Sequence, residues 1–134
     1  MNNDLAVLLK DITKTFGKKV VANKDVTLGI KKGEILSLLG ENGSGKTTLM
    51  NMLAGIYYPD SGHIFVDVNG SGLNEVSISS PKDAYALGIG MIHQHFKLVD
   101  VFTAVENVAL GLDKSIAFNK KQIAQDIKVI CDKY

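Results

Sequence analysis

A glycine-rich octapeptide at Gly40–Thr47 constrains the fold of this chain more than any other feature. It reads Gly-Glu-Asn-Gly-Ser-Gly-Lys-Thr, which fits the pattern G-x-x-x-x-G-K-[ST]. Glycines allow successive backbone N–H groups to turn inward and form an anion-binding concavity without Cβ clashes. An apolar run precedes the octapeptide, and a segment with apolar residues at helical spacing follows it. This order predicts a P-loop, in which the N-terminus of the helix faces a phosphate group.

The loop residues receive individual roles in this interpretation. Lys46 is expected to reach the β- and γ-phosphates of a nucleoside triphosphate, and the Thr47 hydroxyl is expected to ligate Mg²⁺. Thr48 offers a further donor to the α-phosphate. The predicted phosphate loop covers residues 40–48, and its other contact residues are Asn42, Gly43, Ser44 and Gly45. The alternative is a glycine-rich turn with a surface lysine, but a chance match arises in only about one chain in 200 of this length.

Hydrophobic patterning predicts an α/β chain around this loop. Strands are expected at residues 5–13, 24–30, 34–39, 62–69 and 89–93. Helices are expected at 47–56, at 81–87 after a Ser80 cap, at 103–110 behind a Thr103–Glu106 capping box, and at 119–134. No glycine or proline ends the last helix, so we expect the chain to be cut at Tyr134.

Composition narrows the class of function. A chain of 134 residues is long enough for one domain with a sizeable core. The net charge is +1 and there is no arginine, so we expect no basic surface for nucleic acid. No stretch reaches the roughly 20 apolar residues that a membrane-spanning helix needs. A protein of this composition would work at a membrane only through another subunit.

The run Glu34–Met50 resembles the first half of the ATPase subunits of ABC transporters. Phe16 is similar to the aromatic residue that stacks on adenine in that family, and Val21 to the aliphatic residue that borders the base. The run Gly90–Val99 resembles the family's Q-loop, with Gln94 as the glutamine that contacts Mg²⁺ or the attacking water. The alternatives are an ordinary core aromatic for Phe16 and an ordinary loop polar residue for Gln94.

The resemblance implies a fold as well as a site. It extends over residues 5–134 and implies an incomplete P-loop NTPase fold of the ABC ATPase type, with a flanking antiparallel β-subdomain and the start of a helical subdomain. Residues 1–134 would be the N-terminal portion of one ATPase domain. Within it the phosphate loop is expected at 40–48, the Q-loop at 93–99 and the helical subdomain at 103–134.

The resemblance is strongest to the ATPases of bacterial nucleoside and simple-sugar importers, through residues 88–99 and 102–107. It therefore implies an ATP-binding subunit that uses Mg²⁺ and couples ATP binding and hydrolysis to uptake of a nucleoside or simple sugar. The implied partners are a second ABC ATPase cassette, integral-membrane permease subunits and, indirectly, an extracellular solute-binding protein. Such a subunit lies peripherally on the cytoplasmic face of the membrane, and its own sequence does not identify the solute.

Three elements of the family have no counterpart in this sequence: the Leu-Ser-Gly-Gly-Gln signature, the apolar strand ending in Asp-Glu, and the switch histidine. The expected catalytic residues are therefore Lys46 and Gln94 only, and the expected metal contacts are Thr47 and Gln94. We expect the chain alone to bind ATP without turning it over. The alternatives are a truncated nucleotide-binding remnant and a non-transport ABC ATPase. Without neighbouring strands, we expect 35–39 and 89–91 to be poorly covered.

Overall fold

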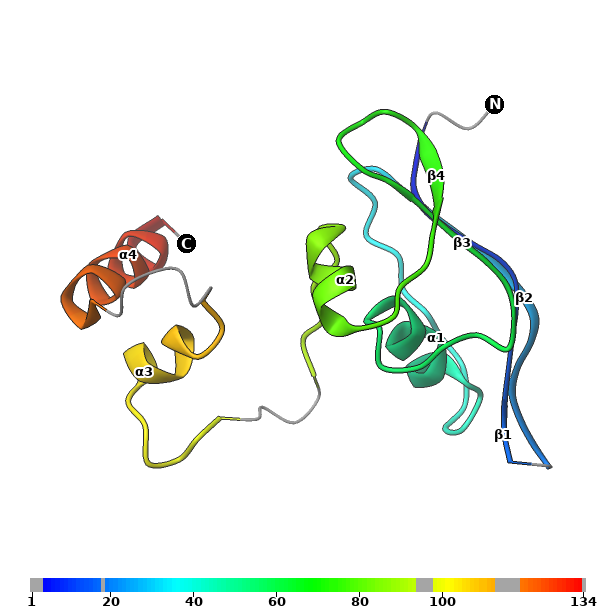
Figure 1. Cartoon of the computed structure of the whole chain (residues 1–134), viewed down its shortest axis with the longest axis horizontal. Helices are drawn as coiled ribbons and strands as arrows, with labels where there is room; N and C mark the ends of the chain where they lie inside the picture. The colour runs from blue at the N-terminus through cyan, green and yellow to red at the C-terminus, as the bar shows by residue number, and fades with distance from the viewer. Residues whose placement is uncertain (1–3, 18, 94–97, 113–118, 134) are drawn as a thin grey trace. The chain divides into compact units, whose positions relative to one another are not determined.

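The computed structural model describes residues 4–17, 19–93, 98–112 and 119–133, and Figure 1 traces the chain. The chain divides into two compact units, residues 1–91 and residues 92–134. The first unit contains β1 (Leu5–Phe16), β2 (Val20–Lys31), α1 (Lys46–Leu53), β3 (Ser61–Asp67), β4 (Leu73–Val76) and α2 (Pro81–Ala86). The second unit contains α3 (Ala104–Ala109) and α4 (Lys120–Lys133).

The four strands of the first unit form one antiparallel sheet in the order β2-β1-β3-β4. β1 and β2 make a long hairpin, and β3 pairs with the other edge of β1. Between β3 and β4, Asn69 has a φ of 63° and Gly70 a φ of 75°. These left-handed conformations are the ones that an Asn-Gly hairpin turn requires. The strands predicted at 5–13, 24–30 and 62–69 are confirmed, whereas β4 was not predicted.

One face of this sheet carries the core of the first unit. Across β1 and β3, Leu9 pairs with Ile64 and Val7 with Val66, so strand alternation directs these side chains to the same face. α1 and α2 cover that face (Figure 1). The buried cluster consists of Leu9, Ile12, Leu49, Met52, Leu53, Ile64, Val66, Ile78 and Ala84. Since α1 contributes three of these side chains, the core fixes the position of α1 and of the loop that precedes it.

Four register shifts interrupt the alternation of the β1–β2 hairpin, and two of them contain an aspartate. One extra residue lies in β1 between Leu9 and Ile12, and one lies in β2 between Asn23 and Val26. A single extra residue moves every later side chain of a strand to the other face of the sheet. As a result Leu9 and Ile12, three positions apart, are both buried, and Asn23 is only 7% exposed.

Aspartate residues occupy the shift between Leu9 and Ile12 and the shift between Asn23 and Val26. Asp11 has a φ of 53° and Asp25 a φ of 48°, conformations that aspartate tolerates better than most side chains. The N–H of Asp11 donates to the Thr27 hydroxyl and the N–H of Asp25 to the Thr13 hydroxyl, each at 3.0 Å. Each bulge therefore replaces a lost ladder hydrogen bond by one to a threonine of the opposite strand.

The strands predicted at 34–39 and 89–93 are wrong for the described part of the chain, which shows no regular structure there. Ile35 is 97% and Leu39 89% exposed. A strand is stable only beside a partner that shares its hydrogen bonds, and the described residues place none beside 34–39. The expected poor coverage is thus found at Ile35 and Leu39, whereas Ile89 packs against the core cluster.

The predicted helix starts are confirmed. Ser80 caps α2 by accepting from the N–H of Asp83, and Thr103 and Glu106 form the capping box of α3. α1 begins at Lys46 and ends at Leu53, three residues before the predicted end. On α4, Ile123 is buried while Ile130 is 61% exposed. Searched over the described residues, no helix has the length and apolar character to cross a membrane.

In the second unit, the carboxylate of Glu106 accepts three hydrogen bonds. The Thr103 N–H and hydroxyl donate to Oε2 at 2.8 and 2.7 Å, and Lys120 Nζ donates to Oε1 at 3.0 Å. These bonds, the Thr103 N–H foremost, lower the pKa of Glu106 from its ordinary value of 4.5 to about 2. A carboxyl whose pKa is lower in the folded state stabilises that state above its unfolded pKa, and the stabilisation is lost as the pH falls through the folded value.

We therefore expect the second unit to lose helical structure progressively as the pH falls from 4.5 to about 2. In Glu106→Gln this part of the acid loss should disappear, because the amide can still accept from Thr103 but does not titrate. Circular dichroism of both chains over that pH range measures the difference. Asp132→Asn, an exposed carboxyl on α4, serves as control and should behave like the unmodified chain. An acid profile unchanged in Glu106→Gln would contradict the role of this carboxylate.

Candidate phosphate-binding site

The predicted phosphate loop leads directly into α1. Gly43 has a φ of 83° and Gly45 a φ of 85°, left-handed conformations that glycine adopts without strain. The N–H of Ser44 donates to the Glu41 carbonyl at 3.2 Å and closes a tight turn between them. Gly45 is the N-cap of α1, and no side chain caps the helix there. The first N–H groups of α1 therefore have no intrahelical partner and are open to an external acceptor.

The Lys46 ammonium lies across the loop. Its Nζ donates to the carbonyl oxygens of Gly40 and Glu41, both at 2.7 Å, and to the Ser44 hydroxyl at 3.2 Å. An ammonium has three protons, so each of them has an acceptor within the loop. All three acceptors are uncharged, because Glu41 contributes its backbone carbonyl and not its carboxylate. Among the residues that the structure describes, no carboxylate forms an ion pair with Lys46.

The surroundings of the loop favour an anion. The first turn of α1 contains no acidic side chain, and the positive end of the helix dipole adds to the charge of Lys46. The Asn42, Ser44 and Thr47 side chains are exposed beside the loop, and Thr48 is half-buried. The structure therefore brings all the predicted loop residues together around the start of α1. Their arrangement can bind a phosphate group.

The backbone of β2 lies against the end of the loop. A Cβ atom on Gly45 would lie 2.1 Å from the Ala22 carbonyl oxygen and 2.8 Å from Asn23 Nδ2, so only glycine fits. Asn23 Nδ2 also donates to the Gly45 carbonyl at 3.4 Å. Sequence reasoning did not identify Asn23, because strict alternation from Val26 would place it on the outer face. The bulge between the two residues turns it inward, and no local signal reveals which strand residue a bulge will bury.

The predicted adenine-stacking residue lies at the end of the β1–β2 hairpin, where Phe16 pairs with Val20. The Phe16 ring makes an edge contact with Tyr57, with ring centroids 5.1 Å apart, and Lys14 Nζ lies 5.7 Å from its centroid. Phe16 is 37% exposed and Val21 is 57% exposed. The alternative of an ordinary core aromatic is thus wrong, since Phe16 lies at the surface.

Asp60 holds this end of the hairpin in place. Its carboxylate accepts from Lys14 Nζ and from the N–H of Thr15, each at 2.7 Å. The hydrogen bond from Lys14, followed by that from Thr15, lowers the pKa of Asp60. The N–H of Asp60 in turn donates to the Thr13 carbonyl at 2.8 Å. Both Lys14 and the backbone beside Phe16 are therefore anchored to the segment that precedes β3.

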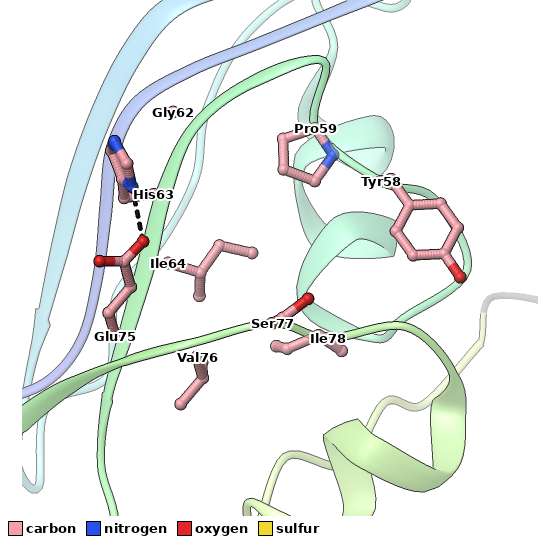
Figure 2. Close-up of a pocket in the computed structure, with 9 residues that line it drawn as sticks. All are labelled: Tyr58, Pro59, Gly62, His63, Ile64, Glu75, Val76, Ser77 and Ile78. Atoms are coloured by element: carbon pink, nitrogen blue, oxygen red, sulfur yellow. Dashed lines mark hydrogen bonds and ion pairs between the residues drawn. The ribbon is translucent and has the colours of Figure 1, made fainter.

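Two further observations bound the site. Gln94, the predicted Q-loop glutamine, lies outside the described residues. A separate cavity of about 220 Å³ lies beside β3 and β4 (Figure 2), where His63 Nδ1 and Glu75 Oε1 are 2.6 Å apart. None of the residues that line this cavity was predicted as a site residue. Within the described residues of the first unit, the loop at 40–48 is the one surface where a lysine and several glycines meet a helix start without a side-chain cap.

Comparisons with known proteins agree with this geometry. A glycine loop of the pattern G-x-x-x-x-G-K-[ST] that opens a helix defines the P-loop class of proteins. The family described as ABC transporter matches residues 23–133, and this chain belongs to that family. It is 50% identical over 117 residues to the guanosine import ATP-binding protein NupO of Bacillus subtilis (strain 168). It is 46% identical over 136 residues to the nucleoside import ATP-binding protein NupA of Lactococcus lactis subsp. cremoris (strain MG1363).

The matches cover most of this chain but only part of the relatives. The alignments span 86% and 100% of this chain and 22% and 26% of the two relatives. Among solved structures, a dimeric cassette of a bacterial ABC transporter is 30% identical, with a TM-score of 0.66 over 91% of this chain and 54% of that one. An ATP-binding cassette in a post-hydrolysis state, bound to ADP and phosphate, has the same TM-score at 27% identity. The predicted incomplete ABC ATPase fold is thereby confirmed.

The contact between Gly45 and β2 predicts unequal effects of alanine at the two left-handed glycines. Gly43→Ala should lower the free energy of unfolding by about 1–2 kcal/mol, the cost of a left-handed alanine. No steric cost adds to this, because nothing lies within 4 Å of the new Cβ. Gly45→Ala should cost about 1–3 kcal/mol more, since its Cβ must displace β2. Urea unfolding of both variants measures the difference. Equal losses would show that β2 does not press on the loop.

Proposed function

We propose that this chain binds ATP with Mg²⁺ through residues 40–48, as part of the ATPase subunit of an ABC importer for a nucleoside or simple sugar. The observation that carries the proposal is the loop itself. There Lys46, which has no ion-pair partner among the described residues, lies at a helix start without a side-chain cap. Family membership supports ATP as the nucleotide. The names of the two relatives support the nucleoside class, because one is an import ATP-binding protein for guanosine and the other for nucleosides.

Lys46 would bind the β- and γ-phosphates by exchanging acceptors. Its three protons already have acceptors in the loop, so a phosphate oxygen must replace at least one of them. The exchange is favourable because an anionic oxygen accepts a stronger hydrogen bond from an ammonium than a neutral carbonyl does. The N–H groups at the start of α1 would hold the remaining oxygens, with Asn42, Gly43, Ser44, Gly45, Thr47 and Thr48 lining the loop.

Mg²⁺ would enter with the nucleotide rather than alone. It prefers six oxygen ligands and commonly takes several of them from phosphates and water. This chain would contribute the Thr47 hydroxyl, which is exposed beside the loop, and the Gln94 side chain. The ion would supply charge neutralisation at the phosphates. Two side-chain oxygens are too few to hold it without the triphosphate.

Phe16 and Val21 would form the surface for adenine. Both are exposed at the end of the hairpin, and a flat aromatic ring stacks on a base without base-specific hydrogen bonds. The contacts with Tyr57 and Lys14 hold the Phe16 ring in one orientation, which lowers the entropy lost on stacking. β2 would then lie beside both the base and the phosphates. Val21 would border the base, and the next residue, Ala22, lies against Gly45 of the loop.

The complete subunit would contain this chain as the N-terminal portion of one ATPase domain. Its Q-loop would lie at 93–99 and its helical subdomain would begin at 103–134. The subunit would pair with a second cassette and lie on the cytoplasmic face of the membrane through permease subunits, with a solute-binding protein acting outside. The chain alone lacks the family's signature and acidic strand motif. It would therefore bind ATP without steady hydrolysis.

Lys46→Ala tests the phosphate role directly. The unmodified chain should bind ATP with Mg²⁺ in a calorimetric titration, and the variant should bind about ten- to a hundredfold more weakly, the effect of losing a charged hydrogen-bond donor. Lys82→Ala, an exposed lysine on α2, should bind like the unmodified chain. Neither chain should release phosphate steadily. ATP turnover that Lys46→Ala abolishes would overturn the claim that this chain only binds.

Phe16→Ala separates recognition of the base from recognition of the phosphates. ATP affinity should fall about five- to a hundredfold, the range expected for one lost base–aromatic stack. Affinity for inorganic triphosphate, which has no base, should stay unchanged. Tyr85→Ala removes an aromatic residue that is 80% exposed on α2 and should affect neither ligand. Equal losses for ATP and triphosphate in Phe16→Ala would exclude the stacking role.

A further inference from the structure

Asn23 is the one buried polar residue in the part of the chain that the structure describes, with 7% of its surface exposed. It lies on β2, in the region where that strand meets the end of the phosphate loop. A buried carboxamide is stable only when its donor and acceptor atoms both find partners. Nδ2 has a partner in the Gly45 carbonyl, at 3.4 Å. Oδ1 is buried without one.

This incomplete satisfaction weighs against a purely structural role. A buried acceptor without a partner destabilises a protein, and replacing such a group by an apolar one of similar shape is often neutral or stabilising. Leucine branches at Cγ as asparagine does and has no polar atom to leave unpaired. The carboxamide is therefore a poor choice for stability alone. Its one hydrogen bond, to a residue of the loop, is the remaining reason for its presence.

The bond to Gly45 determines the direction of a particular N–H group. The Gly45 carbonyl accepts from Leu49 N at 2.9 Å as well as from Asn23, which uses both of its lone pairs. The described residues contain no cis peptide bond, and in a trans peptide the C=O and the next N–H point in opposite directions. When Asn23 and Leu49 hold the Gly45 carbonyl, the Lys46 N–H must point away from both, toward the open start of α1.

We propose that Asn23 is a positioning residue of the phosphate loop, whose carboxamide holds the Gly45 carbonyl so that the Lys46 N–H faces the bound phosphate. The inference rests on the proposed function, because it assumes that the loop binds a phosphate chain. Asn23 touches no nucleotide atom in this scheme and acts through the Gly45–Lys46 peptide group. Its effect should be the same for every ligand that carries a triphosphate.

The test uses Asn23→Leu and Asn23→Asp in the full chain. Both remove the donor, the first with an apolar side chain and the second with a carboxylate of the same shape. Asn74→Leu is the matched control, because Asn74 Nδ2 also donates to a glycine carbonyl, that of Gly72 at 3.0 Å, but outside the loop. Affinities for ATP and for inorganic triphosphate are measured by calorimetry, stability by urea unfolding, and the Lys46 amide by its ¹⁵N chemical shift.

We expect Asn23→Leu to unfold at the same or a higher urea concentration, while ATP and triphosphate affinities both fall about three- to tenfold, the value of one backbone hydrogen bond. The Lys46 amide shift on triphosphate binding should shrink in parallel. Asn23→Asp should lose at least as much affinity, and Asn74→Leu none. A structural role alone would lower stability and leave the affinity of the folded fraction unchanged.

The outcomes separate this inference from the proposed function. If the unmodified chain binds neither ATP nor triphosphate, the proposed function fails and the inference fails with it. If the unmodified chain binds both and a folded Asn23 variant binds equally well, only the inference is overturned. It is also overturned if both variants unfold, which would make the carboxamide a folding requirement, or if ATP affinity falls and triphosphate affinity does not.

Discussion

The close approach of Gly45 to the Ala22 carbonyl is the constraint on which the site depends. A Cβ at this position would lie 2.1 Å from that oxygen, so the loop and the hairpin meet backbone to backbone. Next to this contact, the core cluster packs α1 onto the sheet, which opposes any separation of the loop from β2. The start of α1, the last turn of the loop and the inward side of β2 therefore form one rigid group. A phosphate site assembled on such a group needs little rearrangement.

The residue that would bind the ligand also stabilises the loop. Lys46 holds the loop together through carbonyl and hydroxyl oxygens, and these neutral partners leave its charge available to an anion. A carboxylate in the same place would have formed an ion pair and weakened the attraction of phosphate. The glycines matter for the same reason as the lysine, because they let carbonyl groups approach the ammonium closely. Lys46 thus first stabilises the folded loop through these oxygens and would then exchange some of them for phosphate oxygens when the ligand binds.

Features encoded by a few neighbouring residues were predictable from the sequence. The helix that follows the glycine-rich loop, the Ser80 cap and the Thr103 capping box all depend on contacts between residues close in the chain. The strand predicted at 34–39 failed because a strand depends on partners elsewhere, and the described residues place none beside it. Asn23 could not be identified, since its burial depends on a bulge that no local pattern announces. Gln94 stays a prediction.

The bulge at Asp25 has a consequence for how this hairpin can vary. Between Asn23 and Val26 the spacing decides which residue faces the loop, so removing or adding one residue there would bring a charged or aliphatic neighbour against Gly45. Gly17, just after β1, lies beyond that point, and a Cβ there would meet nothing within 4 Å. Length changes in related chains should therefore avoid the stretch from 23 to 26. In this protein the number of residues between Asn23 and Val26 is therefore as important for the site as their chemical identity.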